Sequence, residues 1–264
     1  MRLFVTGASS GIGEALAREY ARRSPDLTIG LVARRGDELA RVASLLPGAR
    51  VLSYAIDVTD RARLADAARE FMAEAGGPPD VVIANAGISA GTVTGEQGDG
   101  AVFSRIFAVN VIAMFDTFAP FVPAMRAARA GTLVGIASVA GIRGLPGAGA
   151  YSASKAAAIA YLESLRVELR GSGIDVVTIA PGYIRTAMTD RNPYPMPFLL
   201  DADVFARRAI GAIDRRRSFV VIPWPMRIVA ALMRLLPNAL YDRLFERAPR
   251  KPRAAGGDDP SGGR

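Results

Sequence analysis

A tyrosine and a lysine four residues apart have the spacing that proton-transfer chemistry requires. Tyr151 and Lys155 fall at the start of a predicted helix, where positions i and i+4 share one face. A nearby ammonium lowers the pKa of a phenol, which is about 10 in a free tyrosine, toward a range useful for general acid–base catalysis. Lys155 and Lys251 are the only lysines among 33 basic residues. Position 155 therefore keeps a compact ammonium where the chain otherwise uses arginine.

Ser138 closes a predicted strand that ends in Gly135-Ile136-Ala137-Ser138. Ligands of α/β sheets bind beyond the carboxyl ends of the strands, so this hydroxyl is placed to donate to a substrate carbonyl oxygen. Serine at a strand end is also a common turn residue. The position alone does not decide between these two interpretations.

A glycine-rich turn follows the first predicted strand, in the run Thr6-Gly7-Ala8-Ser9-Ser10-Gly11-Ile12-Gly13, and a helix begins at once. Glycines allow the backbone to approach a diphosphate, and the helix N-terminus offers free N–H groups and a favourable dipole. The spacing differs from G-x-G-x-x-G, and a plain tight turn is the alternative. Its place after the first strand of an alternating pattern favours dinucleotide binding. The residues expected to contact the cofactor here are Gly7, Ser9, Ser10, Gly11, Ile12 and Gly13.

The end of the second predicted strand selects between the two nicotinamide cofactors. An acidic residue there binds the 2′-hydroxyl of NAD, and a basic residue pairs with the 2′-phosphate of NADP. The strand ends in Arg34 and Arg35, with no acid before Asp37. The sequence therefore favours NADP(H) over NAD(H). The alternative is that both are surface arginines in an arginine-rich chain.

The composition excludes several classes of site. The 264 residues include no cysteine and no histidine, which excludes disulfides, thiolate zinc sites, His metal sites and Ser-His-Asp triads. No metal is expected. The formal charge is +8, but the arginines are spread among acidic residues, so nucleic-acid binding is not expected. No targeting segment and no charge-free apolar run of about 18 residues stands out. A cytoplasmic location is expected.

Short apolar, β-branched runs alternate with longer amphipathic ones. This pattern predicts an α/β fold, a Rossmann-type doubly wound parallel sheet of seven strands in one domain over residues 1–224. The predicted strands are Leu3–Thr6, Leu27–Ala33, Arg50–Ile56, Asp80–Ala84, Thr132–Ala137, Asp175–Ala180 and Phe219–Ile222. The predicted helices are Gly11–Arg23, Asp37–Leu45, Arg61–Glu74, Ala101–Ala128 and Ala150–Arg170.

Three further segments differ in composition from the rest of the chain. Residues 183–201 are rich in proline and apolar side chains (among them Met188, Tyr194, Met196 and Phe198) and indicate a lid. These side chains either favour a partly apolar substrate or pack on neighbouring helices. Residues 225–247 predict two basic amphipathic helices, expected to pack on the domain or at a subunit interface rather than on a membrane. Residues 248–264 lack apolar content apart from alanine and are predicted to be a disordered tail.

Taken together, these motifs resemble the classical short-chain dehydrogenase/reductase family. The resemblance covers about residues 2–222. The matching motifs, in the family's order, are the TGxxxGxG turn at Thr6–Gly13, Asn85-Ala86-Gly87, Ser138, the pair Tyr151 and Lys155, and Pro181-Gly182-Tyr183-Ile184-Arg185-Thr186. Two positions depart from the pattern: Ala84 replaces the first Asn of the common NNAG motif, and Ser10 stands where many NADP-preferring members carry a basic residue.

The resemblance implies roles for the matching residues. Tyr151 would be the general acid and base, Lys155 would lower its pKa and hold the nicotinamide ribose, and Ser138 would polarise the substrate carbonyl. Asn110 would kink a helix and support a water relay to the lysine. Cofactor contacts are further implied for Asp57, Val58, Asn85, Ala86, Gly87, Pro181, Gly182, Ile184 and Thr186. The family also implies homodimers or homotetramers, formed through the helices at Ala101–Ala128 and Ala150–Arg170.

The resulting expectation is an NAD(P)-dependent oxidoreductase that moves hydride reversibly between NADP(H) and a small-molecule carbonyl compound or secondary alcohol. Two alternatives carry different chemistry. A regulator or scaffold can use the same fold without catalysis, although it would be expected to lose the Tyr, Lys and Ser set. An epimerase or dehydratase of the extended relatives shares Tyr and Lys but needs a larger C-terminal substrate region.

Overall fold

Seven parallel strands form the central sheet of the computed structural model, which describes residues 1–190, 192 and 194–253. The order across the sheet is β3-β2-β1-β4-β5-β6-β9, and β7 and β8 form a separate two-stranded pair. The predicted doubly wound α/β fold is confirmed. The strands are β1 (Arg2–Thr6), β2 (Thr28–Ala33), β3 (Arg50–Ala55), β4 (Val81–Ala84), β5 (Gly131–Ile136), β6 (Ile174–Pro181), β7 (Ile184–Arg185), β8 (Leu200–Asp201) and β9 (Phe219–Ile222).

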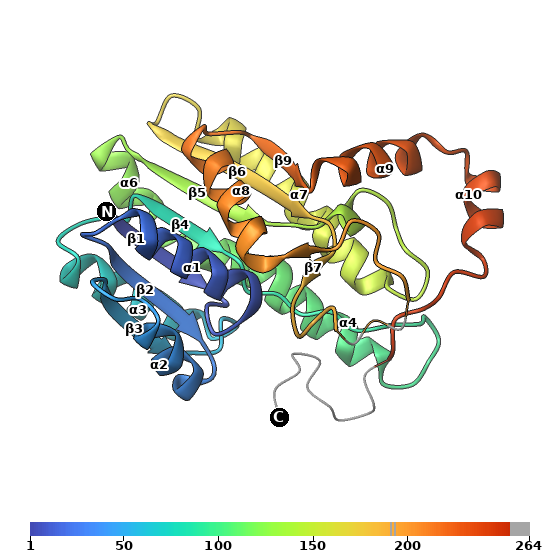
Figure 1. Cartoon of the computed structure of the whole chain (residues 1–264), viewed down its shortest axis with the longest axis horizontal. Coiled ribbons are helices and arrows are strands. Elements are labelled where there is room, and N and C mark those ends of the chain that lie inside the picture. The colour runs from blue at the N-terminus through green and yellow to red at the C-terminus, as the bar shows by residue number, and fades with distance from the viewer. Residues whose placement is uncertain (191, 193, 254–264) are drawn as a thin grey trace.

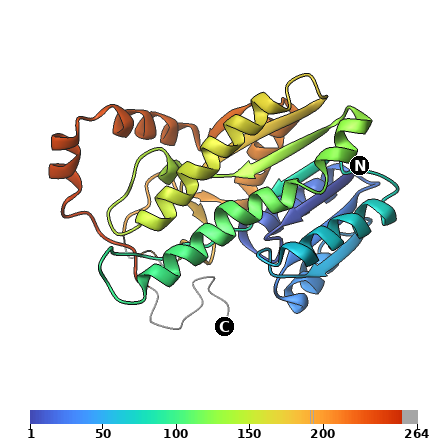
Figure 2. The same cartoon turned by 180° about the vertical axis from the view of Figure 1, so that it is seen from behind.

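The helices cover both faces of this sheet, as Figures 1 and 2 show from opposite sides. They are α1 (Gly11–Arg23), α2 (Gly36–Ser44), α3 (Arg61–Glu74), α4 (Asp99–Phe107), α5 (Ala113–Phe118), α6 (Val122–Ala128), α7 (Gly149–Glu168), α8 (Ala202–Asp214), α9 (Trp224–Leu235) and α10 (Asn238–Phe245). Successive residues of a strand point to opposite faces. Phe4 thus packs with α3, α5 and α7 residues, whereas Leu3 and Val5 pack with α1, α2 and α8 residues.

The prediction of a single helix over Ala101–Ala128 is wrong, because the range is divided into α4, α5 and α6. A π-turn, η1 (Ala108–Ile112), separates α4 from α5, and the chain turns again before α6. Pro123 lies in the first turn of α6, where its missing N–H costs nothing because that group has no acceptor within the helix. By length and hydropathy, Asp99–Ala128 could span a membrane, but half of the apolar window is buried inside the protein. Such burial is typical of a helix packed on a sheet.

Helices α9 and α10 project beyond the sheet and are tied to the loop after β5 (Figure 1). The Arg143 guanidinium donates to the carbonyl oxygens of Met233 and Leu236 and lies 3.9 Å from the centroid of the Tyr241 ring. Six large apolar side chains of these helices remain exposed: Trp224, Ile228, Leu232, Leu235, Leu240 and Leu244. Burial of this surface in a subunit interface stays a prediction.

The predicted disordered tail, 248–264, is described only in part, because 254–264 lie outside the described residues. The preceding residues, Ala248 to Arg253, have defined contacts with the domain, which departs from the expectation. Composition indicates disorder when a segment has too little apolar surface to bury. Here the contacts are polar: Gly91 N–H donates to the Pro252 carbonyl at 2.8 Å, and Arg253 pairs with Asp99.

A buried carboxylate on α1 makes stability depend on pH. Glu19 is 8% exposed and accepts hydrogen bonds from the guanidinium groups of Arg22 and Arg23 at 2.6–2.9 Å. The Arg22 contact, opposed by burial and helped by Arg23, lowers the pKa of Glu19 from 4.5 to about 2. A carboxyl with a lowered folded-state pKa stabilises the protein above the unfolded value, and this contribution disappears as pH falls toward the folded value.

We therefore expect Glu19→Gln to lower the thermal midpoint at pH 7 by about 2–4 °C, for a loss near 1 kcal/mol. The difference from wild type should shrink between pH 4.5 and pH 2, the interval between the two pKa values. Thermal unfolding followed by circular dichroism measures both. Glu70→Gln, at an exposed position of α3, is the control. A difference that stays constant down to pH 2 would contradict the assignment.

Candidate active site

One cavity of about 420 Å³ opens at the carboxyl ends of the parallel strands, within the size range of small-molecule and cofactor sites. The structure brings nearly all of the predicted site residues to it. The lining residues that the sequence analysis named are Gly7, Ser9, Ser10, Gly11, Ile12, Arg34, Arg35, Asp57, Val58, Asn85, Ala86, Gly87, Ser138, Tyr151, Lys155, Pro181, Gly182, Ile184 and Thr186. Gly13 and Asn110 do not line it and act from behind its wall.

The glycine turn between β1 and α1 is packed so closely that side chains cannot enter it. A Cβ atom on Gly13 would lie 2.2 Å from the Gly7 carbonyl oxygen, and one on Gly7 would lie 2.7 Å from Ala86 Cα. Gly7 also has φ +67°, a left-handed conformation that glycine adopts without strain. Ser10, the residue before α1, makes no side-chain cap, so the first N–H groups of the helix have no capping oxygen at the point where Ser10, Gly11 and Ile12 line the cavity.

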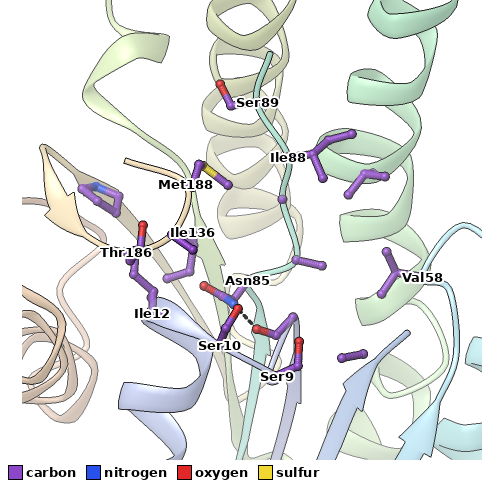
Figure 3. Close-up of a pocket in the computed structure, with 18 of the residues that line it drawn as sticks. Ser9, Ser10, Ile12, Val58, Asn85, Ile88, Ser89, Ile136, Thr186 and Met188 are labelled. Atoms are coloured by element: carbon purple, nitrogen blue, oxygen red, sulfur yellow. Dashed lines mark hydrogen bonds between the residues drawn. The ribbon is translucent and has the colours of Figure 1, made fainter. Parts of the chain in front are cut away.

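Asn85 ties this turn to the end of β4. Its Nδ2 donates to the carbonyl oxygens of Thr6 and Gly7 at 3.1 and 3.0 Å, and its backbone N–H donates to the Thr6 hydroxyl at 3.2 Å. Figure 3 shows Asn85 beside Ser10 at the turn. The amide side chain thus holds the turn in shape. Thr6 has the same structural role, which the sequence analysis did not assign to it.

Basic side chains lie around the end of β2, and an ion pair holds the end of β3. Arg34 and Arg35 both line the cavity, and an Arg35 guanidinium nitrogen lies 3.4 Å from the Ser9 hydroxyl. Asp57 pairs with Arg105 at 2.6 Å. Burial opposes ionisation of Asp57, but hydrogen bonds from Thr59 and Arg105 outweigh it and lower its pKa. Asp57 is therefore an anion held in place by its neighbours.

Tyr151 lies in the first turn of α7, facing Ser138 at the end of β5. Burial raises the pKa of the Tyr151 phenol, and a hydrogen bond with the Ser138 side chain offsets part of that rise, so the net lowering expected from Lys155 is not found in the structure. Ser138 is buried, and its hydroxyl also accepts from the Ala140 N–H at 3.2 Å. The two hydroxyls thus meet at one point of the cavity wall. An oxygen atom placed there would be within reach of two donors.

Lys155 lies one turn further along α7, on the same face as Tyr151. Its Nζ is 5.9 Å from the centroid of the Tyr151 ring and donates to the Ile136 carbonyl at 2.8 Å. The side chain is 4% exposed, and this burial lowers its pKa from 10.5 to about 8. Lys155 is therefore still mainly an ammonium at neutral pH, held beside the phenol.

Asn110 lies in the π-turn η1 and is fully buried. Its Oδ1 accepts from the Ile88 N–H at 2.9 Å, and its Nδ2 donates to the Ile88 carbonyl at 3.0 Å and to the Ser154 hydroxyl at 2.9 Å. The side chain therefore joins the helix to the strand-end loop after β4 and to α7. The predicted irregularity at this residue is present, as a π-turn.

The predicted lid begins at the edge of the cavity. A Cβ atom on Gly11 would lie 3.1 Å from Thr186 Cγ2, so Thr186 lies against the glycine turn. Figure 3 shows Thr186 beside Ile12, and Met188 further along the cavity near Ile136. Residues 191 and 193 lie outside the described residues. Among Met188, Tyr194, Met196 and Phe198, Met188 lines the cavity, and Phe198 is 52% exposed. The apolar side chains of this segment thus give little support to an apolar substrate.

The cavity is also lined by residues that the sequence motifs did not indicate. They are Ala33, Glu38, Ile56, Ile88, Ser89, Arg105, Val109, Ile136, Ala137, Ala187 and Thr189. Most flank a predicted position by one or two residues, so a window around each strand end would have found them. Arg105 belongs to α4 and has no such signal in the sequence.

Comparison with known proteins agrees with this architecture. The short chain dehydrogenase family matches residues 2–194. The chain belongs to the short-chain dehydrogenase family. It is 37% identical over 245 residues to an uncharacterized oxidoreductase of Myxococcus xanthus, covering 92% of this chain and 95% of that protein. It is accordingly an oxidoreductase of this family, acting on CH–OH groups with a nicotinamide cofactor.

Solved structures of short-chain dehydrogenases show the same fold with cofactor bound. A short-chain dehydrogenase/reductase from Burkholderia phymatum in complex with NAD has a TM-score of 0.79 and 25% identity, covering 96% of this chain and 98% of that one. A short-chain dehydrogenase from Sphingobium yanoikuyae in complex with NADPH has a TM-score of 0.76 and 28% identity, covering 90% and 97%. Members of this dehydrogenase family thus use either nicotinamide cofactor.

Proposed function

We propose that this dehydrogenase transfers hydride reversibly between NADP(H), in preference to NAD(H), and a carbonyl compound or secondary alcohol, with Tyr151 as the general acid and base. The observation that carries the proposal is a single cavity that joins the glycine turn to the side chains of Ser138, Tyr151 and Lys155. A dinucleotide needs the glycine turn to bind its diphosphate. Proton transfer to a carbonyl oxygen needs a group such as the Tyr151 phenol.

The geometry of this chain fits a nicotinamide dinucleotide. Residues of the glycine turn from Gly7 to Ile12 line the cavity, and the N-terminus of α1 supplies N–H donors for a diphosphate there. By the family resemblance, Asp57 and Val58 would contact the adenine. The same resemblance assigns the remaining cofactor contacts to Asn85, Ala86, Gly87, Pro181, Gly182, Ile184 and Thr186.

When bound, the cofactor supplies or accepts the hydride. In the direction of reduction, Tyr151 donates its phenolic proton to the carbonyl oxygen, and the Ser138 hydroxyl donates a second hydrogen bond to the same oxygen. In oxidation, Tyr151 takes that proton back as a base. The Lys155 ammonium stabilises the phenolate left behind and would hold the nicotinamide ribose.

Asn110 is assigned a positioning role. The amide group of Asn110 makes its hydrogen bonds to Ile88, in the loop after β4, and to Ser154, on α7. It therefore sets the distance between α7 and that loop. A Cβ atom on Gly87 would lie 3.4 Å from Asn110 Oδ1 and 3.5 Å from Lys155 Nζ. Asn110, Gly87 and Lys155 are thus close neighbours, an arrangement compatible with the water relay that the family resemblance implies.

Arg34 provides the test of cofactor preference. We expect Arg34→Ala to raise the Kd for NADPH about tenfold, by removing a charge-assisted contact with the 2′-phosphate, and to change the Kd for NADH less than about twofold. Fluorescence titration with both nucleotides in parallel measures this. Arg126→Ala, on α6 and away from the cavity, controls for loss of one positive charge. An equal rise in the Kd for NADPH and in the Kd for NADH would mean that Arg34 does not contact the 2′-phosphate.

We further propose that the enzyme acts in the cytoplasm as a homodimer or homotetramer that pairs through α4, α5 and α7. Four large apolar side chains of this helical surface are 44–60% exposed in the single chain: Phe103, Ile112, Phe115 and Val167. Burial of such a surface between copies would remove it from water, and most soluble homo-oligomers have closed symmetry.

A further inference from the structure

The C-terminal segment, residues 248–253, returns from α10 toward the loop that precedes α4 (Figure 1). Gly91, in the loop after β4, donates its N–H to the Pro252 carbonyl at 2.8 Å and forms an isolated parallel bridge with Arg253. A Cβ atom on Gly91 would lie 2.3 Å from the Lys251 carbonyl oxygen. The C-terminal segment is therefore seated against backbone, in a position that only glycine at 91 allows.

Two arginines fasten the C-terminal segment on either side. Arg253 lies 3.1 Å from a carboxylate oxygen of Asp99 and 3.1 Å from one of Glu96, and Asp99 is itself buried. On the other side, Arg250 packs on Gly147, where a Cβ atom would lie 2.8 Å from Arg250 Cβ. Gly147 belongs to the loop that joins Ser138 to Tyr151. The C-terminal segment thus bridges two loops that border the substrate side.

This attachment places the second lysine of the chain beside the catalytic tyrosine. Lys251 Nζ donates to the Ser89 hydroxyl at 2.6 Å and lies 5.3 Å from the centroid of the Tyr151 ring. Lys155 Nζ lies 5.9 Å from the same centroid. Ser89 and Tyr151 both line the cavity, and Lys251 reaches these two residues from just outside that lining. The chain has only two lysines, and both ammonium groups lie next to one phenol.

Lys251 differs from the arginines around it in its partners. Among the described residues, its ammonium forms no salt bridge with a carboxylate, whereas Arg253, two positions away, pairs with Asp99 and Glu96. Burial lowers the pKa of Lys251 to about 8, so it is still mainly charged at neutral pH. A partly buried charge with only a neutral hydroxyl partner is costly, and an anion in the cavity would relieve that cost.

We propose that Lys251 binds a carboxylate on the substrate, so that the substrates of this enzyme are oxo acids and hydroxy acids in which the carboxylate and the reacting carbon are separate groups. This inference rests on the proposed function, because it assumes that Tyr151 marks the reacting carbon. One ammonium with one hydroxyl donor, from Ser89, matches a carboxylate with its single charge. A phosphate group is more often met by the forked donors of arginine.

Binding of a matched pair of small probes tests the proposal without any need for turnover. Isothermal titration of the full-length protein in the presence of NADPH measures Kd for benzoate and for the neutral analogue benzamide. We expect wild type to bind benzoate at least about tenfold more tightly, as a charge-assisted hydrogen bond would give. Lys251→Met should bring the ratio of the two Kd values close to one, and Lys251→Arg should keep part of the preference.

Arg247→Met is the matched control, because it removes one positive charge from a side chain that is 94% exposed. It should keep the wild-type ratio. Equal affinities for benzoate and benzamide in wild type, or a ratio unchanged by Lys251→Met, would overturn the proposal. A loss of preference in Arg247→Met as large as in Lys251→Met would also overturn it, since general charge attraction would then explain the result.

A second variant tests the attachment of the C-terminal segment. Gly91→Ala leaves Lys251 in the chain but puts a methyl group where the Lys251 carbonyl lies, so it should lower benzoate affinity as Lys251→Met does. Gly100→Ala, at a position in α4 where a Cβ atom meets nothing within 4 Å, should not. Benzoate affinity unchanged in Gly91→Ala would show that the seating on Gly91 does not place Lys251, and would overturn that part of the inference.

These readouts separate the two proposals. If wild type discriminates benzoate from benzamide through Lys251 but no carbonyl compound consumes NADPH, the proposed function fails and the anion site stands. If NADPH is consumed with neutral and anionic carbonyl compounds alike and Lys251→Met changes neither Kd, the proposed function stands and the anion site fails.

Discussion

Tyr151→Phe is expected to lower kcat/KM about 1,000-fold while the Kd for reduced cofactor stays within about twofold. The substitution removes one oxygen atom from the cavity wall, and with it the proton that the carbonyl oxygen must receive. The ring that packs against Ser138 and the two lysines remains. Cofactor consumption with a carbonyl substrate and fluorescence titration with NADPH measure the two quantities on the same sample.

Tyr161→Phe is the matched control for this experiment. Tyr161 lies on the same helix, α7, and packs against Phe115 at a ring distance of 6.0 Å, outside the cavity. It should keep wild-type activity. Turnover by Tyr151→Phe within about tenfold of wild type would mean that the proton comes from elsewhere, and the assignment of the general acid would have to be abandoned.

Gly13→Ala is expected to weaken cofactor binding at least about 100-fold, a loss near 2.7 kcal/mol. The added methyl group would lie 2.2 Å from the Gly7 carbonyl oxygen and 2.7 Å from Asn85 Nδ2, so the turn must open. Opening moves the N–H groups that would hold the diphosphate and breaks the contact between Asn85 and Gly7. Fluorescence titration with NADPH measures the loss.

Gly100→Ala again serves as the control, because it adds the same methyl group to a helix at a position without neighbours. It should leave the Kd for NADPH unchanged. Far-UV circular dichroism checks that Gly13→Ala keeps its secondary structure, which separates a local change in the turn from loss of the fold. An unchanged Kd in a folded Gly13→Ala protein would place the diphosphate somewhere other than this turn.

Residues near the end of the chain contact the loop between Ser138 and Tyr151. Arg143, in the loop between Ser138 and Tyr151, holds α9 and α10 through the carbonyls of Met233 and Leu236. The C-terminal segment then returns to Gly91 and Gly147. The loop that joins Ser138 to Tyr151 is therefore held by residues from the end of the chain.

The sequence by itself determined the fold class and most of the cavity. Buried parallel strands need apolar side chains on both faces, so β1, β2 and β5 appear as short β-branched runs with boundaries within one residue of those observed. The Tyr151–Lys155 pair was readable because residues four apart share a helix face. The glycine turn could be predicted because its residues, Thr6 to Gly13, are consecutive in the sequence.

Tertiary structure decided what depends on contacts between distant parts of the chain. Asn110 lies in the π-turn that breaks the predicted helix at Ala101–Ala128, and its hydrogen bonds go to Ile88 and Ser154, 22 and 44 residues away. The family resemblance implied a kink at this residue but not these partners. Lys251 reaches Ser89 across 162 residues. The hydrophobic periodicity of the sequence does not predict such a hydrogen bond, because the two partners meet only after the sheet has formed and brought its loops to one edge. The two lysines therefore looked unrelated in the sequence, and only the folded chain places both beside Tyr151.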